Sequence, residues 1–435
     1  MKDIRLELDQ HTVSDDRRTV RHLIATLKAP ARPKDDAVPP PLDLGLVIDV
    51  SGSMSGPPLE AAKQAAAGVV ERLGPDDRLT LVAFEDNVHI LFEALTLDPA
   101  GRGQAIERIL SLGTGGCTNL AGGWSAAGTL LAAEAALTPG RRRHVIVLSD
   151  GMANRGLTDP SMLGKEASAL LECGVPTSCV GIGDHYSTDQ LDALAEHGGG
   201  RLHDAETPQE IVEVLLGELG ELAAVTAERV SLSLDLPEGV TAVDLAGGPA
   251  RQRGRTLVCR LGSLRSGAER QLVLRLELEA NATRGEPMEF GWEVSWSTPG
   301  GRDSHRERGL VKLVPCAGPH APVSEIHAAV VVEKWVAGLV RRVTSLNRHE
   351  GYQEIQDLQR RELPALEAYA QPHPSLAHAV SRVRHLFTQA LRPIAERSRK
   401  EMYLLSKKLQ LREADHRKVH RGAWFDQMPG TESHT

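Results

Sequence analysis

Between residues 42 and 226, short apolar runs alternate with stretches in which apolar residues recur every three or four positions. Runs such as residues 44–50 and 144–149 are apolar at nearly every position, which is typical of strands buried on both faces of a parallel sheet. The intervening stretches carry one apolar stripe, as amphipathic helices do. The alternation predicts a doubly wound α/β domain over residues 42–226. Its other strands are expected at residues 78–84, 176–182 and 201–203, and its helices at residues 59–73, 104–112, 120–137, 161–171, 188–196 and 208–226.

The stretches on either side of this domain alternate with period two. Residues 227–316 contain five such runs, separated by Gly, Pro and charged turns, which predicts an antiparallel β-sandwich. Residues 1–41 contain two shorter runs of the same kind, followed by a proline-rich linker. Five strands make a thin sandwich, so we expect the N-terminal strands to complete it. The α/β domain would then be inserted into the β-sandwich.

Helical periodicity returns in the last quarter of the chain. Residues 322–421 carry apolar stripes that predict a bundle of three or four helices. Pro364 and Pro393 are expected to end or kink helices, because proline cannot donate a backbone hydrogen bond. Residues 422–435 are expected to form a flexible tail.

Composition and charge narrow the class of protein. A chain of 435 residues is long enough for about three domains, and its net charge of −8 argues against a surface built mainly to bind polyphosphates. There is no apolar run long enough to span a membrane and no apolar core in the first ten residues that would mark a secretory signal. The five cysteines are scattered without a C-x-x-C pair, as is typical of reduced thiols. These features predict a soluble, cytoplasmic protein without a membrane span.

Candidate chemistry lies where the predicted parallel strands end. Asp49, Ser51 and Ser53 follow the first strand of the α/β domain, Thr118 lies in a glycine-rich loop before a helix, and Asp150 follows the third strand. Open α/β sheets place their ligands at this carboxyl edge, so we expect the five side chains to converge. Hard oxygen ligands suit Mg²⁺, with Mn²⁺ or Ca²⁺ as alternatives, rather than zinc or copper.

The D-x-S-x-S motif alone also fits a polar turn, in which the Asp or Ser side chain bonds to the local backbone. Thr118 and Asp150, on matching strand ends, favour the interpretation as a metal site.

The segments LGLVIDVSGSMSGPPLEAAKQAA, DDRLTLVAFEDNV, GTGGCTNLAGGW and HVIVLSDGMANRG carry these residues. Together they resemble the metal-ion-dependent adhesion site (MIDAS) of von Willebrand factor A domains, across roughly residues 42–226. The flanking pieces are similar to bacterial intracellular proteins in which this domain stands between a β-sandwich and a helical tail.

The resemblance implies a non-catalytic interaction module or scaffold in an intracellular assembly, in which an Asp or Glu of a partner protein completes the metal shell. Family members often work beside an ATPase, kinase or phosphatase, so a protein of that kind is an expected partner.

Neighbouring loop residues are candidates for reading the partner, since an exposed Trp or Met is a natural anchor. For Trp124 the alternative is packing on the sheet under its own helix. The candidates are Met54, Trp124, Met152, Asn154 and Arg155.

Two other functional classes stay open. A metal-dependent hydrolase could use the same pocket with His185 or Glu85 as general base, although the common catalytic motifs are absent and Ser51 stands where a phosphoaspartyl hydrolase would need a second acid. A nucleic-acid binder could use the basic helices after residue 380, as a resemblance to the Ro and Ku proteins would allow. Tyr403 is the lone nearby aromatic, which is too little for base stacking and disfavours nucleic acid. That basic face could equally be solvated or lie against the acidic helix of residues 208–226.

Overall fold

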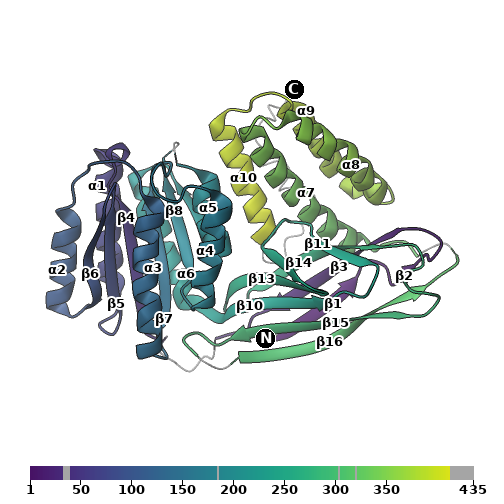
Figure 1. Cartoon of the computed structure of the whole chain (residues 1–435), viewed down its shortest axis with the longest axis horizontal. Helices are drawn as coiled ribbons and strands as arrows, with labels where there is room; N and C mark the ends of the chain where they lie inside the picture. The colour runs from purple at the N-terminus through teal and green to yellow at the C-terminus, as the bar shows by residue number, and fades with distance from the viewer. Residues whose placement is uncertain (33–39, 184–185, 302–303, 319–320, 412–435) are drawn as a thin grey trace.

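A computed structural model describes residues 1–32, 40–183, 186–301, 304–318 and 321–411, which form three units (Figure 1). The α/β unit comprises residues 42–224, and the β unit combines residues 3–28 with residues 225–315. The helical unit, residues 325–411, lies beside the α/β unit and above the β unit in this view. Within the described ranges, no helix is both long and apolar enough to cross a bilayer.

The α/β unit is a six-stranded sheet in the order β6-β5-β4-β7-β8-β9, with helices on both faces. All neighbouring strands are parallel except β5 and β6. Apolar residues of α1, α2 and α6 form the core on one face, and those of α3, α4 and α5 form the core on the other. The strands are β4 (Leu42–Asp49), β5 (Arg78–Phe84), β6 (Val88–Thr96), β7 (Arg142–Ser149), β8 (Thr177–Ile182) and β9 (Gly199–Ala205), and the helices are α1 (Pro57–Arg72), α2 (Pro99–Leu110), α3 (Leu120–Leu137), α4 (Pro160–Glu172), α5 (Thr188–His197) and α6 (Pro208–Ala224).

These elements agree with the predicted doubly wound pattern, and one strand was missed. Strand β6 lies at the sheet edge, where its side chains are exposed or half-buried, and Ala94 interrupts it with a φ of 47°. A half-exposed, irregular strand lacks the continuous apolar run that marks the buried strands.

The β unit has two sheets, β1-β3-β14-β11 and β12-β13-β10-β15-β16-β2, with an apolar core drawn from both. Strand β3 pairs antiparallel with β14 from Thr19 to Lys28, so the N-terminal segment belongs to this unit and the α/β unit is inserted within it. The strands are β1 (Asp3–Leu8), β2 (Thr12–Val13), β3 (Thr19–Lys28), β10 (Val225–Asp235), β11 (Val240–Asp244), β12 (Ala250–Arg253), β13 (Thr256–Arg265), β14 (Glu269–Leu278), β15 (Met288–Ser297) and β16 (Ser304–Pro315).

The chain leaves the α/β unit without a spacer, because α6 ends at Ala224 and β10 begins at Val225. The incoming and outgoing segments are tied together there. Thr226 Oγ1 donates to the carbonyl oxygen of Pro30 at 2.8 Å, and the backbone nitrogen of Ser266 donates to the carbonyl oxygen of Ala224 at 2.8 Å. Pro30 and Thr226, on either side of the insertion, therefore lie side by side, and Ser266 of the β13–β14 turn holds the end of α6.

The helical unit contains four α-helices and a short 3₁₀ turn, Pro374–Leu376. Its apolar core extends into the β unit through Ile24 and Val273, so the helices pack on the first β sheet. Pro364 does not end a helix, because α8 continues past it, and a kink there stays a prediction; Pro393 lies between helices, as expected. Residues 412–421 of the predicted bundle and the tail at 422–435 lie outside the described residues. The helices are α7 (Glu325–Arg348), α8 (Tyr352–Ala370), α9 (Ala377–Ala390) and α10 (Glu396–Leu411).

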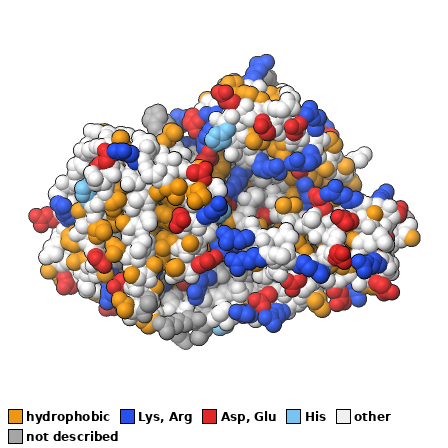
Figure 2. Space-filling model, viewed as in Figure 1, with side chains coloured by type: hydrophobic (Ala, Val, Ile, Leu, Met, Phe, Trp, Pro, Cys, Tyr) orange, Lys and Arg blue, Asp and Glu red, His pale blue; other side chains and the backbone are white. Residues whose placement is uncertain are grey.

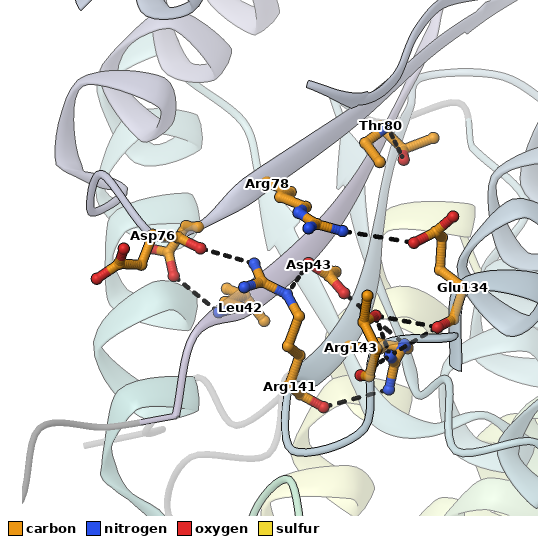
Figure 3. A network of polar contacts seen from close by, with 11 residues as sticks. Leu42, Asp43, Asp76, Arg78, Thr80, Glu134, Arg141 and Arg143 are labelled. Atoms are coloured by element: carbon orange, nitrogen blue, oxygen red, sulfur yellow. Dashed lines mark hydrogen bonds and ion pairs between the residues drawn. The ribbon is translucent and has the colours of Figure 1, made fainter. Parts of the chain in front are cut away.

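A polar network joins the amino ends of the central strands (Figure 3). Asp43, at the start of β4, accepts a hydrogen bond from Arg141 Nε at 2.6 Å, and Arg143 Nε lies 3.8 Å from its other oxygen. Arg78 of β5 pairs with Glu134 of α3 at 3.4 Å. These contacts fix strands β4, β5 and β7 and helix α3 to one another, so this end of the sheet has a structural role.

Candidate metal centre

The motif after β4 folds into a tight turn around the Asp49 carboxylate. The backbone nitrogen of Ser51 donates to Asp49 Oδ1 at 2.9 Å, and a 3₁₀ turn follows over Gly52–Met54. Ser51 Oγ and Ser53 Oγ lie 3.1 Å apart in a hydrogen bond. The local turn expected of such a motif therefore exists, and it gathers three side-chain oxygen groups at the carboxyl end of the strand.

The other two predicted ligands reach the same place from other elements. Ser53 Oγ donates to Asp150 Oδ1 at 2.8 Å, at the end of β7. A Cβ atom placed on Gly151 would lie 3.2 Å from Thr118 Oγ1 and 3.4 Å from Ser53 Oγ, so the missing side chain leaves a small cradle beside these hydroxyls. The structure thus brings all five predicted residues together at one edge of the sheet.

The electrostatics of this cluster are set by the buried carboxylate of Asp49, whose hydrogen-bond donors among the described residues are neutral. Asp49 is fully buried, and Ser51 and Ser149 donate hydrogen bonds to its carboxylate. Burial raises the pKa of Asp49, and the neighbouring charge of Asp150 adds to the rise. Among the described residues, no Lys or Arg forms an ion pair with Asp49. A cation placed here would relieve this unfavourable burial.

The donor set fits a hard divalent cation. It offers two carboxylates and three hydroxyls, two of which lie close to the side-chain-free face of Gly151. The described residues contain no group of three or more His, Cys, Asp or Glu side chains that could hold a metal, so a zinc-type cluster is not formed in that part of the chain. Oxygen ligands with few charges are the kind that Mg²⁺ accepts while keeping positions for water or an outside oxygen.

Ser149 is a contact residue that the sequence analysis did not identify. Ser149 Oγ donates to Asp49 Oδ2 at 2.5 Å. Ser149 Oγ also accepts a hydrogen bond from the backbone nitrogen of Gly151 at 3.3 Å. It therefore orients the buried carboxylate from the neighbouring strand. The available signal was a hydroxyl residue at the end of an otherwise apolar strand, directly before Asp150.

Asn154 and Arg155, predicted to contact a partner, both hold the metal-site loops. Asn154 Oδ1 accepts a hydrogen bond from the backbone nitrogen of Thr118 at 2.9 Å, and its own backbone nitrogen donates to the Thr118 carbonyl at 3.2 Å. Arg155 Nε lies 2.8 Å from Asp86 Oδ1, while Asp86 Oδ2 accepts from the backbone nitrogen of Cys117 at 3.1 Å. Both side chains remain exposed, so a role in partner contact stays a prediction.

Two of the predicted partner residues are in the core. Met54 is 0% exposed and Trp124 is 3% exposed. The Trp124 indole Nε1 donates to Thr177 Oγ1 at 3.0 Å, so its packing under α3 is the alternative that the structure supports. A buried side chain cannot anchor a partner, and for these two residues the prediction was wrong. Met152 is 63% exposed beside Asp150 and remains a candidate.

Described residues that suggested a hydrolase or a nucleic-acid binder form contacts within the molecule. Glu85 accepts hydrogen bonds from Asn87 and His89, which lower its pKa and make it a weak base; His185 lies outside the described residues. On α10, Lys400 pairs with Asp204 and Lys407 pairs with Asp192 and Glu196, all of the α/β unit. Lys and Arg side chains gather where the units meet (Figure 2). Part of the basic face is therefore used for contacts inside the molecule.

Known proteins resemble this chain over different lengths. Residues 43–215 match the sequence family described as von Willebrand factor type A domain. An uncharacterized protein of Synechocystis sp. is 31% identical over 256 residues, which cover 55% of this chain and 58% of that protein. The inter-alpha-trypsin inhibitor heavy chain H3 of Mesocricetus auratus is 28% identical over 173 residues, 37% of this chain and 19% of its own length. The matched region thus spans less than two thirds of each relative.

Two solved structures share the fold over most of the chain. A von Willebrand factor type A protein from Catenulispora acidiphila superposes with a TM-score of 0.66 at 16% identity, covering 93% of this chain and 96% of its own. The ArnB paralog VWA2 from Sulfolobus acidocaldarius gives a TM-score of 0.56 at 14% identity, covering 89% and 96%. The chain therefore contains a von Willebrand factor type A domain, a kind of domain that typically mediates protein–protein interaction.

Proposed function

We propose that this protein is a non-catalytic, metal-dependent protein-binding module or scaffold, whose metal site takes up an acidic side chain of a partner protein. Mg²⁺ is the proposed ion, with Mn²⁺ and Ca²⁺ as alternatives. Its ligands would be Asp49, Ser51, Ser53, Thr118 and Asp150.

The observation that carries the proposal is the convergence of two carboxylates and three hydroxyls, with no basic partner for Asp49 among the residues that the structure describes. Two carboxylates at most balance a divalent charge, and hydroxyls add none. Bound there, the ion would supply an electrophilic position that a carboxylate from outside fills better than water does. The chain's own residues do the orienting: Ser149 holds Asp49, and Asn154 holds the backbone of Thr118.

The setting we propose is a bacterial cytoplasm, with an ATPase, kinase or phosphatase among the partners. The described cysteines are all free thiols, which is compatible with a reducing compartment. We propose binding rather than catalysis because Glu85, the candidate base that the structure describes, already accepts hydrogen bonds from Asn87 and His89.

The test uses the full chain and an array of peptides that each present one Asp or Glu, beside the same peptides with Asn or Gln. Binding is measured in Mg²⁺, in Mn²⁺ and in EDTA, together with calorimetric titration of each metal into the metal-free protein. We expect a subset of acidic peptides to bind only with metal, and Asp49→Asn to abolish both metal uptake and peptide binding. Binding that is indifferent to EDTA, or equal for the amide peptides, would overturn the proposal.

A matched control is Asp77→Asn. Asp77 is an aspartate at the opposite end of the same sheet, where it accepts hydrogen bonds from the backbone nitrogens of Leu42 and Gly74 at 2.7 Å. This variant should keep metal and peptide binding unchanged, which separates a loss of ligands from a general disturbance of the α/β unit.

A further inference from the structure

Buried ion pairs attach helix α5 of the α/β unit to the helical unit. The Asp192 and Glu196 side chains are 5% and 8% exposed. Lys407 Nζ of α10 lies 3.0 Å from Asp192 Oδ2 and 2.9 Å from Glu196 Oε2. Arg341 Nη1 of α7 donates to Glu196 Oε1 at 2.8 Å and to the carbonyl oxygen of Gly247 in the β unit at 2.7 Å. One face of α5 is therefore tied to both other units.

The first turn of α5 is held as well. Arg348 Nη1, at the end of α7, lies 2.8 Å from Asp189 Oδ1, and Tyr403 of α10 donates its hydroxyl proton to Asp192. Burial raises the pKa of Asp192, so this charge depends on its partners; burial also acts on Glu196, but Lys407 and Arg341 outweigh it and lower its pKa. Buried charges of this kind fix the position of the helix, because moving α5 away would leave them unpaired.

Gln190 lies between Asp189 and Asp192 in the sequence, and its side chain points towards the edge of the sheet that carries the proposed metal site. It is 7% exposed, and its side chain makes three hydrogen bonds to the backbone of the loop after Asp150. Oε1 accepts from the nitrogen of Ala153 at 2.9 Å, and Nε2 donates to the carbonyl oxygens of Ala153 at 3.2 Å and Thr158 at 2.9 Å. The position of this loop is thus set by α5.

The same loop positions Thr118, one of the proposed metal ligands. Asn154 follows Ala153 directly and is bonded to Thr118 through both its side chain and its backbone. Asp150, another proposed ligand, begins the loop. Hydrogen bonds and ion pairs therefore run without a break from Arg341 and Lys407, through α5 and Gln190, to the metal-site loop.

We propose that Gln190 is a positioning residue that couples the docking of the helical unit to the geometry of the metal site. Loosening α7 or α10 from α5 would release the loop of residues 150–158 and with it Thr118. Because coupling between two sites is reciprocal, metal binding would in turn strengthen the grip of the helical unit on α5. The inference rests on the proposed function where it concerns the metal, but the coupling itself concerns residues of this chain alone.

The first test replaces Gln190 by Met, which is similar in shape and cannot make the three hydrogen bonds. Loss of a group that orients metal ligands typically lowers metal affinity about 10- to 100-fold, and we expect a drop in that range for Mn²⁺ measured by calorimetry. Gln190→Glu keeps the acceptor for Ala153 and loses both donors, so its effect should be intermediate. Hydrogen exchange of the backbone of residues 151–158, measured without metal, should become faster in both variants.

The second test removes an ion pair between α7 and α5 that does not touch the loop. Arg341→Met should lower Mn²⁺ affinity by about 5- to 10-fold and speed exchange in residues 151–158, although Arg341 does not touch that loop. The matched control is Arg275→Met, which breaks a pair between β14 and α8, Arg275 with Glu362 at 2.7 Å, on the side of the helical unit away from α5. This control should leave affinity within twofold and exchange in the loop unchanged.

The double variant Gln190→Met with Arg341→Met decides whether one path is involved. If the two residues act in series, the double variant is no weaker than Gln190→Met alone; multiplied losses, or an Arg341→Met variant that behaves like Arg275→Met, would overturn the coupling. If the wild-type chain takes up no metal, the proposed function fails. The exchange comparison of Arg341→Met and Arg275→Met in metal-free protein still decides the coupling.

Discussion

Strand β4 carries an aspartate at each end, and the two meet opposite surroundings. Asp43, at the amino end, lies between Arg141 and Arg143, so its charge is balanced within the molecule. Asp49, at the carboxyl end, is equally buried and, within the described part of the chain, receives hydrogen bonds from a hydroxyl and an amide, with another carboxylate nearby. The same residue type on the same strand thus has a structural role at one end, while at the other end we propose that it binds an ion.

The difference teaches where to look for function in a sheet of this kind. Parallel strands bring their carboxyl ends to the edge where loops can adapt to a ligand, whereas their amino ends can be closed by local charge pairs. A carboxylate without a cation is costly to bury, so it is hydrogen-bonded, protonated or compensated by an ion.

The largest expected effect on stability comes from removing the Asp43 carboxylate at the amino end of β4. Asp43→Ala leaves the guanidinium groups of Arg141 and Arg143 without their carboxylate in a buried place, which should lower the free energy of unfolding by about 3–5 kcal/mol. Magnesium should not restore the loss. Urea unfolding of the α/β unit, followed with and without Mg²⁺, provides the measurement; a loss below about 1 kcal/mol would mean that the network in Figure 3 is dispensable.

The next effect comes from the carboxyl end and has a different signature. In EDTA, Asp49→Asn should change the free energy of unfolding by no more than about 1 kcal/mol, because the hydrogen bonds can be kept while a buried charge is removed. Wild-type protein should gain about 2.7 kcal/mol at a Mg²⁺ concentration 100 times the dissociation constant, and the variant should gain none. Melting curves at several Mg²⁺ concentrations measure both, and an equal gain in the variant would contradict the assignment of Asp49.

A change of pH should affect the free energy of unfolding through a histidine near the amino end of the sheet. Burial lowers the pKa of His144, in the amino half of β7, to about 4. The unfolded chain takes up a proton near pH 6.5 while the folded chain does not, so stability falls as pH drops from 6.5 towards 4. At pH 5 the expected loss is about 2 kcal/mol.

Replacing this histidine by glutamine tests that loss. Asp244, whose pKa burial raises to about 6, acts with the opposite sign, so the comparison between variants is the useful quantity. We expect His144→Gln to remove the downward slope in EDTA between pH 7 and pH 5, seen in urea midpoints. An unchanged slope would show that the ring is not excluded from protonation in the folded state.

The smallest effect is expected at the rim of the metal edge. Arg155 is 61% exposed and pairs with Asp86, so Arg155→Gln should change the free energy of unfolding by no more than about 0.5 kcal/mol. The comparison is sharpened if this variant alters peptide binding while its melting temperature stays constant. A large loss of stability would place Arg155 with the amino-end arginines instead.

The fold and the five clustered residues could be predicted because each rests on a periodic or positional signal. Buried strands such as β4 and β7 carry unbroken apolar runs in their second halves, and strand ends fix where Asp49 and Asp150 must lie. Strand β12 was missed because all four of its residues are exposed, which leaves no alternation to detect.

The burial of loop side chains could not be read in the same way. Met54 and Trp124 lie in stretches expected to face a ligand, and their burial depends on what packs over them, as with Trp124 and Thr177. The link between Gln190 and Ala153 joins a side chain to a backbone far away in sequence, and such a contact has no pattern along the chain.

The joint at which the α/β unit enters and leaves the β unit has a mechanical consequence. Since Thr226 is bonded to Pro30, the segments on either side of the α/β unit lie next to each other, and Ser266 of the β13–β14 turn holds the end of α6. A force applied to the far edge of the sheet would then reach the β unit through adjacent contacts. Such an attachment should resist tilting of the α/β unit better than a single point would.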